Sequence, residues 1–595
     1  MCGIAGCVGH EGAIDFVLDG LDKMEERGYD SAGLVYPAEG LPELKVIKAV
    51  GVLANLRVAV PAETSAPAAA LGHTRWATHG AKTVENAHPQ VNADGTIAVV
   101  HNGVIVNHAE LRQELEELGY SFRRDEQGNR TGSDTEVVPH LLDRYINEGQ
   151  EPEEAFNKTV RRLEGANAVL AYFGIEPDTI YAARRDANPL HMGVRGNARY
   201  VASMREAIRE TTRWIDPLGK HEMARLSSDP SRYKTWELDG RISTRAPQKD
   251  TTEIEEVSKG EYQHWMLAEI YSAPETIREA IRGRILPEEG IVKLGGLEDH
   301  EVQEKLKAVN RLSIVAMGTS YHAGLIGERL FQEIAGLPVK VHDASEFIDQ
   351  TEPLDLSTAV IGISQSGETI DTIKALHKAK EFNAELLTLG INNSPGSEME
   401  AITDAGVHCR AKKEKSVAST KAFISQVTIL AEMALAMAKE NTPLRRAIMG
   451  ELCLLPGKIE QVLANQEAIQ AAAKKYANSQ NFLYLGRGYE YVSAMEGALK
   501  LKEISYIHAE AYSAGQMKHG PIALIAEDFP TFAIATDSPV YEKTISNINE
   551  IKSRGGPVIA LATEGNNSIH ELVDDVLYVP ASLEQTQPIL NAVAL

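Results

Sequence analysis

The sequence predicts an α/β protein with several domains, and three observations support this prediction. Its 595 residues are too many for one hydrophobic core, since domains average roughly 150 residues. The first 240 residues contain short apolar segments broken by glycine and asparagine, which is typical of strands; examples are Gly3–Val8, Thr96–Val100 and Ala168–Phe173. Further along, apolar strands alternate with long helical patterns, which indicates parallel sheets.

The domain boundaries follow from where the composition changes. Residues 244–262 are mostly polar and contain Pro247, so we expect a linker there. We therefore predict one domain at 1–243 and two more at 263–450 and 451–595.

The composition disfavours several classes of protein. A net charge of −24 argues against nucleic acid or acidic lipid as a partner. The four cysteines form no CxxC pair and no Cys/His cluster, so neither a disulfide framework nor a structural metal is expected. No apolar run is long enough to span a bilayer, and residues 1–30 are too charged for a signal peptide. We expect a cytoplasmic protein that binds neither nucleic acid nor membrane.

The first domain begins with a cysteine at position 2. If Met1 is removed, Cys2 carries a thiol and a free α-amine on one residue. That amine titrates near pH ~8, so it can accept a proton from a thiol whose ordinary pKa is ~8.5. Cys2 is therefore a candidate self-activated nucleophile. The alternative is an N-terminal residue with no role.

Three polar motifs follow in the same domain: HTRWATHG at 73–80, His-Asn-Gly at 101–103 and Ser-Asp-Thr-Glu at 133–136. Arg75 can bind a carboxylate through two hydrogen bonds, and Asp134 can bind an ammonium group. Asn102 and the backbone N–H of Gly103 can stabilise an oxyanion. Alternatively, Arg75 and Asp134 form a structural ion pair, Trp76 is a core aromatic residue and Asn102-Gly103 is an ordinary turn.

With the N-terminal cysteine and the stretch RGYDSAG at 27–33, these motifs closely resemble the class II glutamine amidotransferase domain. The resemblance implies an αββα sandwich of the N-terminal nucleophile hydrolase type, with two antiparallel sheets between helices. It implies Cys2 as nucleophile, its own amine as base, and Asn102 and Gly103 as oxyanion hole. It assigns glutamine binding to Arg75, Trp76, Thr78, His79, Gly103 and Asp134, with Trp76 gating the path of the released ammonia. A charged insertion at 123–131 departs from the family, and we expect it to be a surface loop.

The remainder of the chain repeats a unit of four predicted strands. The first copy has strands at Ser313–Met317, Ala359–Ile363, Leu386–Leu389 and Val407–Arg410, and the second has them at Phe482–Leu485, Phe532–Ala535, Val558–Leu561 and Val576–Val579. Such self-similarity predicts two related parallel-sheet domains. In the first copy a long helix, Lys421–Lys439, follows the fourth strand. The matching helix of the second copy begins at Pro588 and has about eight residues, so we expect the second domain to be truncated.

Two motifs of the first copy are candidates for forming a phosphate site. Residues 364–369 read SQSGET, between the strand 359–363 and a helix predicted at 371–380. Hydroxyls and backbone N–H groups at a helix N-terminus bind phosphate without net positive charge. The alternative is a hydroxyl-rich helix cap. Ser320 and the sequence VAST at 417–420 can face the same crevice, at the carboxyl ends of the strands.

Two motifs of the second copy carry groups that can move protons. In EGALKLKE, residues 496–503, the side chains of Glu496, Lys500 and Glu503 share one helical face. His519 lies in the sequence KHGP, where an imidazole can act as acid or base. Alternatively, the helical face is solvated and His519 is simply polar surface.

SQSGET, VAST, EGALKLKE and KHGP together resemble the paired sugar-isomerase (SIS) domains of the glutamine–fructose-6-phosphate aminotransferases. The resemblance implies a homodimeric enzyme that makes glucosamine 6-phosphate and glutamate from fructose 6-phosphate and glutamine, the first step toward UDP-N-acetylglucosamine. It implies no metal or organic cofactor. It assigns the sugar-phosphate site to Thr319, Ser320, Ser364, Gln365, Ser366, Thr369, Val417 and Ser419. Glu503 would move the proton between C1 and C2, His519 would assist ring opening, in its own site or a neighbouring subunit's, and Lys500 would be a polar partner.

The chain departs from this family at three places. Residues 345–350 read SEFIDQ where basic residues are usual, and 413–416 read KEKS where an apolar lead-in with glycine is usual. The family also continues past the equivalent of Leu595 into a tail that supplies a Schiff-base lysine. The alternative function is therefore glutamine hydrolysis with sugar-phosphate binding but no complete synthesis. A class II amidotransferase with another acceptor would share only the first domain.

Overall fold

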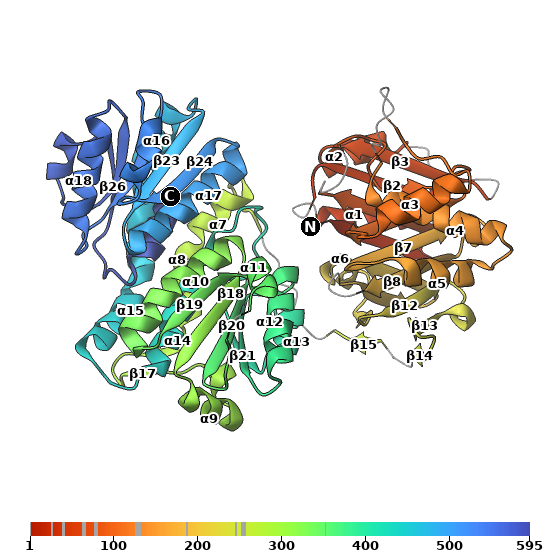
Figure 1. Ribbon diagram of the computed structural model, residues 1–595, viewed down its shortest axis with the longest axis horizontal. Coiled ribbons are helices and arrows are strands. Elements are labelled where there is room, and N and C mark those ends of the chain that lie inside the picture. The colour runs from red at the N-terminus through yellow and green to blue at the C-terminus, as the bar shows by residue number, and fades with distance from the viewer. Residues whose placement is uncertain are drawn as a thin grey trace. The chain divides into compact units, whose positions relative to one another are not determined.

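The computed structural model describes residues 2–24, 28–38, 42–61, 67–76, 81–124, 132–185, 189–243, 247–250, 258–351 and 353–595. The chain divides into two compact units, Met1–Ile254 and Glu255–Leu595 (Figure 1). The division falls within the predicted linker at 244–262. Helix α15 (Pro443–Ala464) runs through position 450, where we place the next boundary, so the domain limits within the second unit remain predictions.

Two antiparallel sheets form the first unit. Among the described residues, one sheet has the strand order β15 (Gln248–Lys249), β11 (Trp214–Pro217), β9 (His191–Arg195), β10 (Ala198–Ala202), β1 (Gly3–Val8), β4 (Ala69–Arg75), β2 (Ser31–Pro37), β3 (Leu44–Val50). The other has the order β14 (Ile242–Ser243), β13 (Lys234–Glu237), β12 (Glu222–Ser227), β8 (Thr179–Arg185), β7 (Asn167–Phe173), β6 (Ile97–Gly103), β5 (Gln90–Val91).

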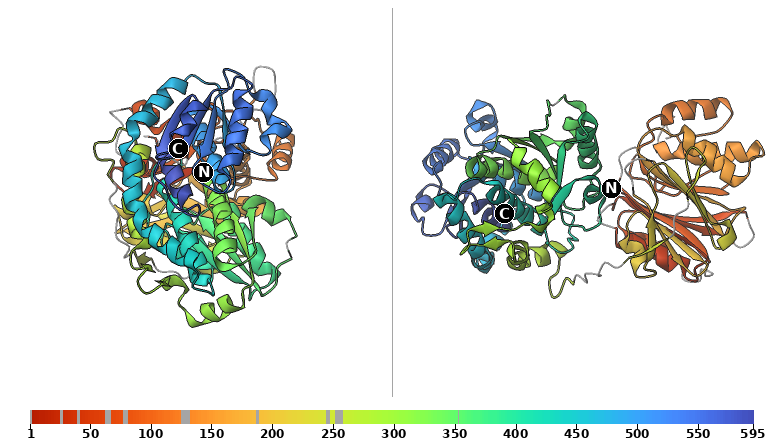
Figure 2. Two further views of the ribbon diagram at one scale, coloured as in Figure 1. Left: turned by 90° about the vertical axis from the view of Figure 1, so that its left-hand side faces the viewer. Right: turned by 90° about the horizontal axis from the view of Figure 1, so that it is seen from below.

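Alternation along the strands determines how these sheets are layered. Successive side chains of a strand point to opposite faces, so Ile4 of β1 packs against the other sheet while Ala5 packs against helices. Helices α1 (Ala13–Asp22), α2 (Leu53–Ala59) and α6 (Glu206–Arg209) cover the outer face of the first sheet. Helices α3 (His108–Glu117), α4 (Val137–Asn147) and α5 (Pro152–Arg162), orange in Figure 2, cover the second. The predicted αββα sandwich is confirmed.

The second unit contains two parallel sheets with the same topology. Within the described residues the first is ordered β19 (Val339–Asp343), β18 (Arg311–Ala316), β20 (Thr358–Ser364), β21 (Leu387–Asn392), β22 (Ala405–His408). The second is ordered β24 (His508–Ser513), β23 (Asn481–Gly486), β25 (Thr531–Ala535), β26 (Val558–Thr563), β27 (Asp575–Val579). The predicted repeat of two parallel α/β domains is therefore present.

The predicted unit of four strands is wrong, because each sheet has a fifth strand at one edge. These strands are β19, with the sequence VKVHD, and β24, with the sequence HAEAYS. The central strands are buried on both faces and read as continuous apolar runs. Strands β19 and β24 are only partly buried and include charged residues, so they carry no such run.

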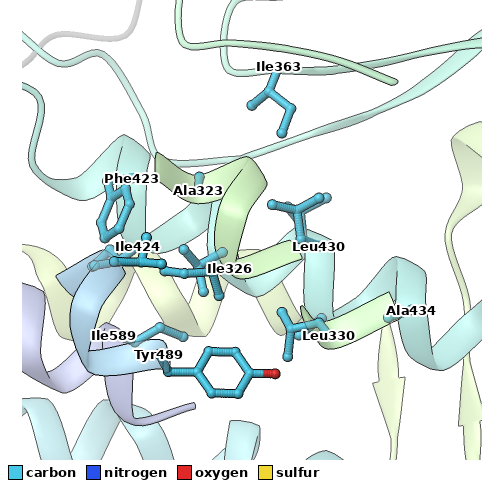
Figure 3. Packing of buried hydrophobic residues seen from close by; sticks show 14 of the residues in the cluster. Ala323, Ile326, Leu330, Ile363, Phe423, Ile424, Leu430, Ala434, Tyr489 and Ile589 are labelled. Atoms are coloured by element: carbon cyan, nitrogen blue, oxygen red, sulfur yellow. The ribbon is translucent and has the colours of Figure 1, made fainter. Parts of the chain in front are cut away.

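The two sheets of this unit share one core. The helices of the second unit are α7 (Trp265–Tyr271), α8 (Ala273–Ile281), α9 (His300–Ala308), α10 (Gly318–Leu330), α11 (Ala344–Asp349), α12 (Ile370–Phe382), α13 (Glu398–Ile402), α14 (Lys421–Met437), α15, α16 (Gln466–Tyr476), α17 (Tyr489–Ser505), α18 (Tyr541–Lys552) and α19 (Gln587–Ala594). Figure 3 shows Leu330 of α10 and Leu430 of α14 close to Tyr489 of α17 and Ile589 of α19. Helices of both copies therefore pack into a single layer between the two sheets.

Helix α19 is the short helix that the sequence predicts from Pro588. It begins at Gln587, and Pro588 occupies its first turn, where proline is tolerated. Ile589 and Leu590 are completely buried in the shared core. Burial contributes roughly 1.5–3 kcal/mol for each such side chain, which supplies the support that a short helix lacks in isolation. In the described residues, no helix is both long enough and apolar enough to cross a bilayer.

Candidate functional site

Strand pairing places Cys2 beside residues from β4 and β6. Gly3 of β1 lies opposite Thr74 of β4, so Cys2 lies next to the chain that leaves β4. The backbone N–H of Trp76 donates a hydrogen bond to the Cys2 Sγ over 3.3 Å. Asn102 Nδ2, from β6 of the other sheet, donates to the Cys2 carbonyl oxygen over 3.1 Å. The candidate nucleophile and the candidate oxyanion donor are thus in contact.

The surroundings of Cys2 determine how its thiol can be activated. Burial raises the pKa of the Cys2 thiol, and the hydrogen bond from Trp76 and the charge of Arg75 only partly oppose this effect. A thiol with a raised pKa is a weak nucleophile at neutral pH unless a base removes its proton. This environment favours activation by an adjacent base, which is the role predicted for the α-amine.

A buried histidine orients Asn102. His73 Nε2 lies 3.0 Å from the His101 carbonyl oxygen and 3.1 Å from Asn102 Oδ1. A carbonyl oxygen can only accept, so His73 Nε2 carries the proton and the nearby atom of Asn102 is its oxygen. Burial lowers the pKa of His73 to about 3, so this histidine remains neutral. The Asn102 amide is therefore held with its N–H groups toward Cys2.

Two predicted glutamine ligands are held near this end of the sheets. Arg75, at the end of β4, and Asp134, at the start of the short 3₁₀ helix 134–136, are both buried. Asp134 Oδ2 accepts from the backbone N–H of Ile105 over 2.8 Å. Burial lowers the pKa of Arg75, and the charges of Asp134 and Asp30 partly oppose this effect, so Asp134 acts electrostatically on Arg75.

The other predicted residues of this domain have different outcomes. Trp76 is 40% exposed and contacts the Tyr29 ring edge-on, so it is not a core residue. Gly103 ends β6 with φ of +127°, a conformation that favours glycine. Thr78 and His79 lie outside the described residues, as does most of the insertion, 125–131.

The first parallel sheet places the predicted phosphate residues at one point. From β18 the chain crosses to β19 on one side and then to β20 on the other, so the winding direction reverses between β18 and β20. Ligands of such sheets bind outside the carboxyl ends of the strands at this point. Ser320 follows β18 and Ser364 ends β20. The SQSGET turn and Ser320 therefore lie at the expected ligand position.

Internal hydrogen bonds shape the SQSGET turn. Ser364 Oγ lies 2.8 Å from Thr369 Oγ1 and accepts from the Gly367 N–H over 3.0 Å. Gly367 has φ of +69°, and a Cβ there would lie 2.1 Å from Ser397 Oγ. Only glycine fits this position without strain. The turn leads into α12, whose free N–H groups suit an anion.

The residues predicted to move protons gather on α17. Lys500 Nζ lies 2.8 Å from Glu503 Oε2 and 3.3 Å from Glu496 Oε1, so one cation joins the two carboxylates. Lys500 Nζ also donates to Thr319 Oγ1 over 3.0 Å. Thr319, predicted to bind the sugar phosphate, thus lies with the proton-transfer residues. The helical face is not merely solvated, since Glu496 and Lys500 are buried.

The segment around VAST is anchored by two acidic residues that the sequence analysis missed. Glu414, within the unusual KEKS sequence, accepts from Ser419 Oγ over 2.9 Å and from the Thr420 N–H over 2.8 Å. Glu269 of α7 accepts from the Ser416 N–H over 3.1 Å. Burial, and then the neighbouring Glu269, raise the pKa of Glu414. Val417 is half exposed, as expected for a residue lining a site.

His519 does not lie with the α17 residues Glu496, Lys500 and Glu503. It ends a short 3₁₀ helix, Met517–His519, and its side chain is exposed. Within the described residues, no hydrogen bond or ion pair joins it to Lys500 or Glu503.

Two buried histidines, His73 and His322, complete these sites and were not predicted. His322 Nδ1 lies 2.7 Å from Glu496 Oε2. The sequence gives one indication that His322 belongs to the site, because it lies three residues after Thr319 on the same face of α10. His73 is the first residue of HTRWATHG, but nothing in its spacing indicates contact with Asn102.

Comparisons with known proteins agree with both parts of the chain. The SIS domain family matches residues 305–437 and 475–595, and the glutamine amidotransferase domain family matches residues 73–210. The chain is 42% identical to an isomerizing glutamine–fructose-6-phosphate aminotransferase of Chlorobaculum tepidum and 40% identical to one of Thermus thermophilus. Both comparisons cover 100% of this chain and 95% of the relative.

A solved structure is similar to the second unit. The C-terminal domain of the glucosamine-fructose-6-phosphate aminotransferase of Francisella tularensis has a TM-score of 0.53 and 32% identity. The similarity covers 57% of this chain and 95% of that domain.

Proposed function

This chain belongs to the family of isomerizing glutamine–fructose-6-phosphate aminotransferases, and we propose that it converts glutamine and fructose 6-phosphate into glutamate and glucosamine 6-phosphate. One observation carries the proposal: the same chain holds the Cys2–Asn102 arrangement and the SQSGET turn, and relatives of this activity match it from end to end. That match supports the complete reaction over the alternative of hydrolysis with sugar-phosphate binding alone.

In the proposed glutaminase reaction, Cys2 Sγ attacks the side-chain amide carbon of glutamine after losing its proton to the α-amine. Asn102 Nδ2 and the Gly103 N–H would stabilise the oxyanion, and Arg75 and Asp134 would hold the carboxylate and ammonium of the substrate. Thr78 and His79 are proposed as further ligands. Collapse of the intermediate releases ammonia and leaves a thioester, which water hydrolyses to glutamate.

In the proposed isomerase reaction, ammonia condenses with C2 of fructose 6-phosphate and one proton moves from C1 to C2. The SQSGET turn and Ser320 would bind the phosphate, with Val417 and Ser419 beside the sugar. Glu503 would carry the proton, with Lys500 Nζ 2.8 Å from its carboxylate oxygen Oε2. His519 would open the sugar ring.

Product analysis tests the proposed function. Purified protein with both substrates is expected to form glucosamine 6-phosphate and glutamate in equal amounts, measured by mass spectrometry. Glutamate without glucosamine 6-phosphate would contradict the proposal and support the alternative function.

The neutral His73 provides a second test of the glutaminase site. We expect His73→Leu to lower kcat for glutamine hydrolysis by about 10- to 100-fold, since a misaligned oxyanion donor loses much of its effect. The KM for glutamine should change little. His73→Gln retains an N–H near the Nε2 position and should recover most of the rate. An unchanged kcat in His73→Leu, or equal losses in the two variants, would contradict this role.

We propose further that the enzyme is a homodimer in which the partner supplies His519. His519 is exposed and, among the described residues, forms no hydrogen bond or ion pair with Glu503, which supports this arrangement. Co-expressed His519→Ala and Glu503→Gln chains, each inactive alone, would form heterodimers with one intact site. Recovery of up to about a quarter of the wild-type activity is expected, because half of the dimers are mixed. No recovery despite mixed dimers would contradict the shared site.

A further inference from the structure

A carboxylate on α17 is held by groups from both copies of the repeat. Glu496 Oε2 contacts His322 Nδ1 at 2.7 Å, and Glu496 Oε1 accepts from Thr319 Oγ1 over 3.0 Å. His322 and Thr319 belong to α10 of the first copy, whereas Glu496 belongs to the second. His322 is 9% exposed and Glu496 is 3% exposed, so water does not replace these contacts.

We propose that His322 is a positioning residue for the isomerase reaction: it holds Glu496, and Glu496 with Thr319 holds the Lys500 ammonium against Glu503. The inference rests on the proposed function, and it adds His322 to the site as a residue that acts through Glu496.

The direction of the hydrogen bonds supports this role. An ammonium group has no acceptor, so Lys500 must donate to Thr319 Oγ1, and the Thr319 hydroxyl proton is then free to point at Glu496. Lysine is a flexible side chain that loses rotamer freedom when its head group is fixed, and the three partners of Lys500 Nζ are Glu496, Glu503 and Thr319. The set of contacts fixes Lys500 only if Glu496 is itself fixed.

The distances from Lys500 Nζ to the two carboxylates also support this role. Lys500 Nζ is closer to Glu503, at 2.8 Å, than to Glu496, at 3.3 Å. His322 satisfies the other oxygen of Glu496. Without that donor, a buried and unsatisfied carboxylate would attract Lys500 more strongly and draw it away from Glu503. Burial alone would raise the pKa of Glu496, but the His322 hydrogen bond and the Lys500 charge outweigh it and lower that pKa.

A purely structural role would look different. His322 also joins the first copy to the second, so its loss could weaken packing in the shared core. Loss of packing lowers the free energy of unfolding whatever replaces the imidazole. Loss of positioning lowers kcat and is repaired by any side chain that restores the donated hydrogen bond.

The test compares His322→Leu with His322→Asn, whose amide N–H lies close to the Nδ1 position. The measurements are kcat and the KM for fructose 6-phosphate in glucosamine 6-phosphate synthesis, glutamine hydrolysis without sugar phosphate, and the thermal unfolding midpoint. His322→Leu should lower the synthesis kcat by about 100-fold, the scale expected for a misplacement of about 1 Å. The KM should stay within about 2-fold, and His322→Asn should recover kcat to within about 5-fold.

Each outcome decides between the two roles. Unchanged synthesis in His322→Leu, or equal loss in both variants together with a lowered unfolding midpoint, would overturn the proposal. Hydrolysis of glutamine by the first unit should not change in either variant. His300→Leu, an exposed histidine at the start of α9, is the matched control and should leave synthesis unchanged. Absence of synthesis in the wild-type protein would instead contradict the proposed function.

Discussion

Replacing Cys2 by alanine is expected to abolish glutamine hydrolysis, with a loss of kcat of about 10⁴-fold or more. Removing the thiol removes the atom placed to form the thioester next to Asn102, and neither the oxyanion donors nor Arg75 can substitute for it. Glutamate release, measured with and without fructose 6-phosphate, reports this loss directly.

Two measurements accompany this variant. Cys453→Ala removes an exposed thiol from the second unit and should leave hydrolysis unchanged. The intact mass of the active protein should lack Met1, since the α-amine of Cys2 is the proposed base. Hydrolysis that persists in Cys2→Ala would rule out Cys2 as the nucleophile.

The second large effect is expected from Glu503→Gln, which should lower glucosamine 6-phosphate synthesis by about 10²- to 10⁴-fold, as for the loss of a general base. The amide keeps the size of the side chain but cannot take a proton. Lys500 would lose one of its two carboxylate partners while retaining Glu496 and Thr319. Synthesis is measured as product formed under saturating glutamine.

Glutamine hydrolysis by the same Glu503→Gln protein serves as the internal reference. Hydrolysis of glutamine in the first unit should continue, because Cys2 and Asn102 are untouched. Glu571→Gln, an exposed carboxylate in the second copy, is the matched control. Full synthesis by Glu503→Gln would remove Glu503 from the mechanism.

Much of the fold could be predicted because its strands are strongly patterned. β1 has the predicted bounds, Gly3–Val8, since its residues alternate between two cores and are all apolar or small. The repeat was visible because the central strands of both parallel sheets are continuous apolar runs. β19 and β24 were missed because their sequences, VKVHD and HAEAYS, include charged residues and carry no continuous apolar run.

The candidate sites were predictable where the chemistry lies in one short segment. SQSGET forms one turn, and Glu496, Lys500 and Glu503 lie on one helical face, so spacing alone relates them. His322 and Glu496 are 174 positions apart and meet because α10 and α17 pack in one layer. Likewise, His73 reaches Asn102 only because β4 and β6 belong to facing sheets. Such contacts depend on tertiary packing, which local patterns do not encode.

The central claim is that one chain hydrolyses glutamine and delivers its amide nitrogen to fructose 6-phosphate. The most direct test supplies glutamine labelled with ¹⁵N in the side-chain amide, together with unlabelled ammonium in the buffer. The account predicts glucosamine 6-phosphate that carries the ¹⁵N label, in an amount equal to the glutamate released. Glutamate accompanied only by free ¹⁵N-ammonium, with no labelled amino sugar, would contradict it.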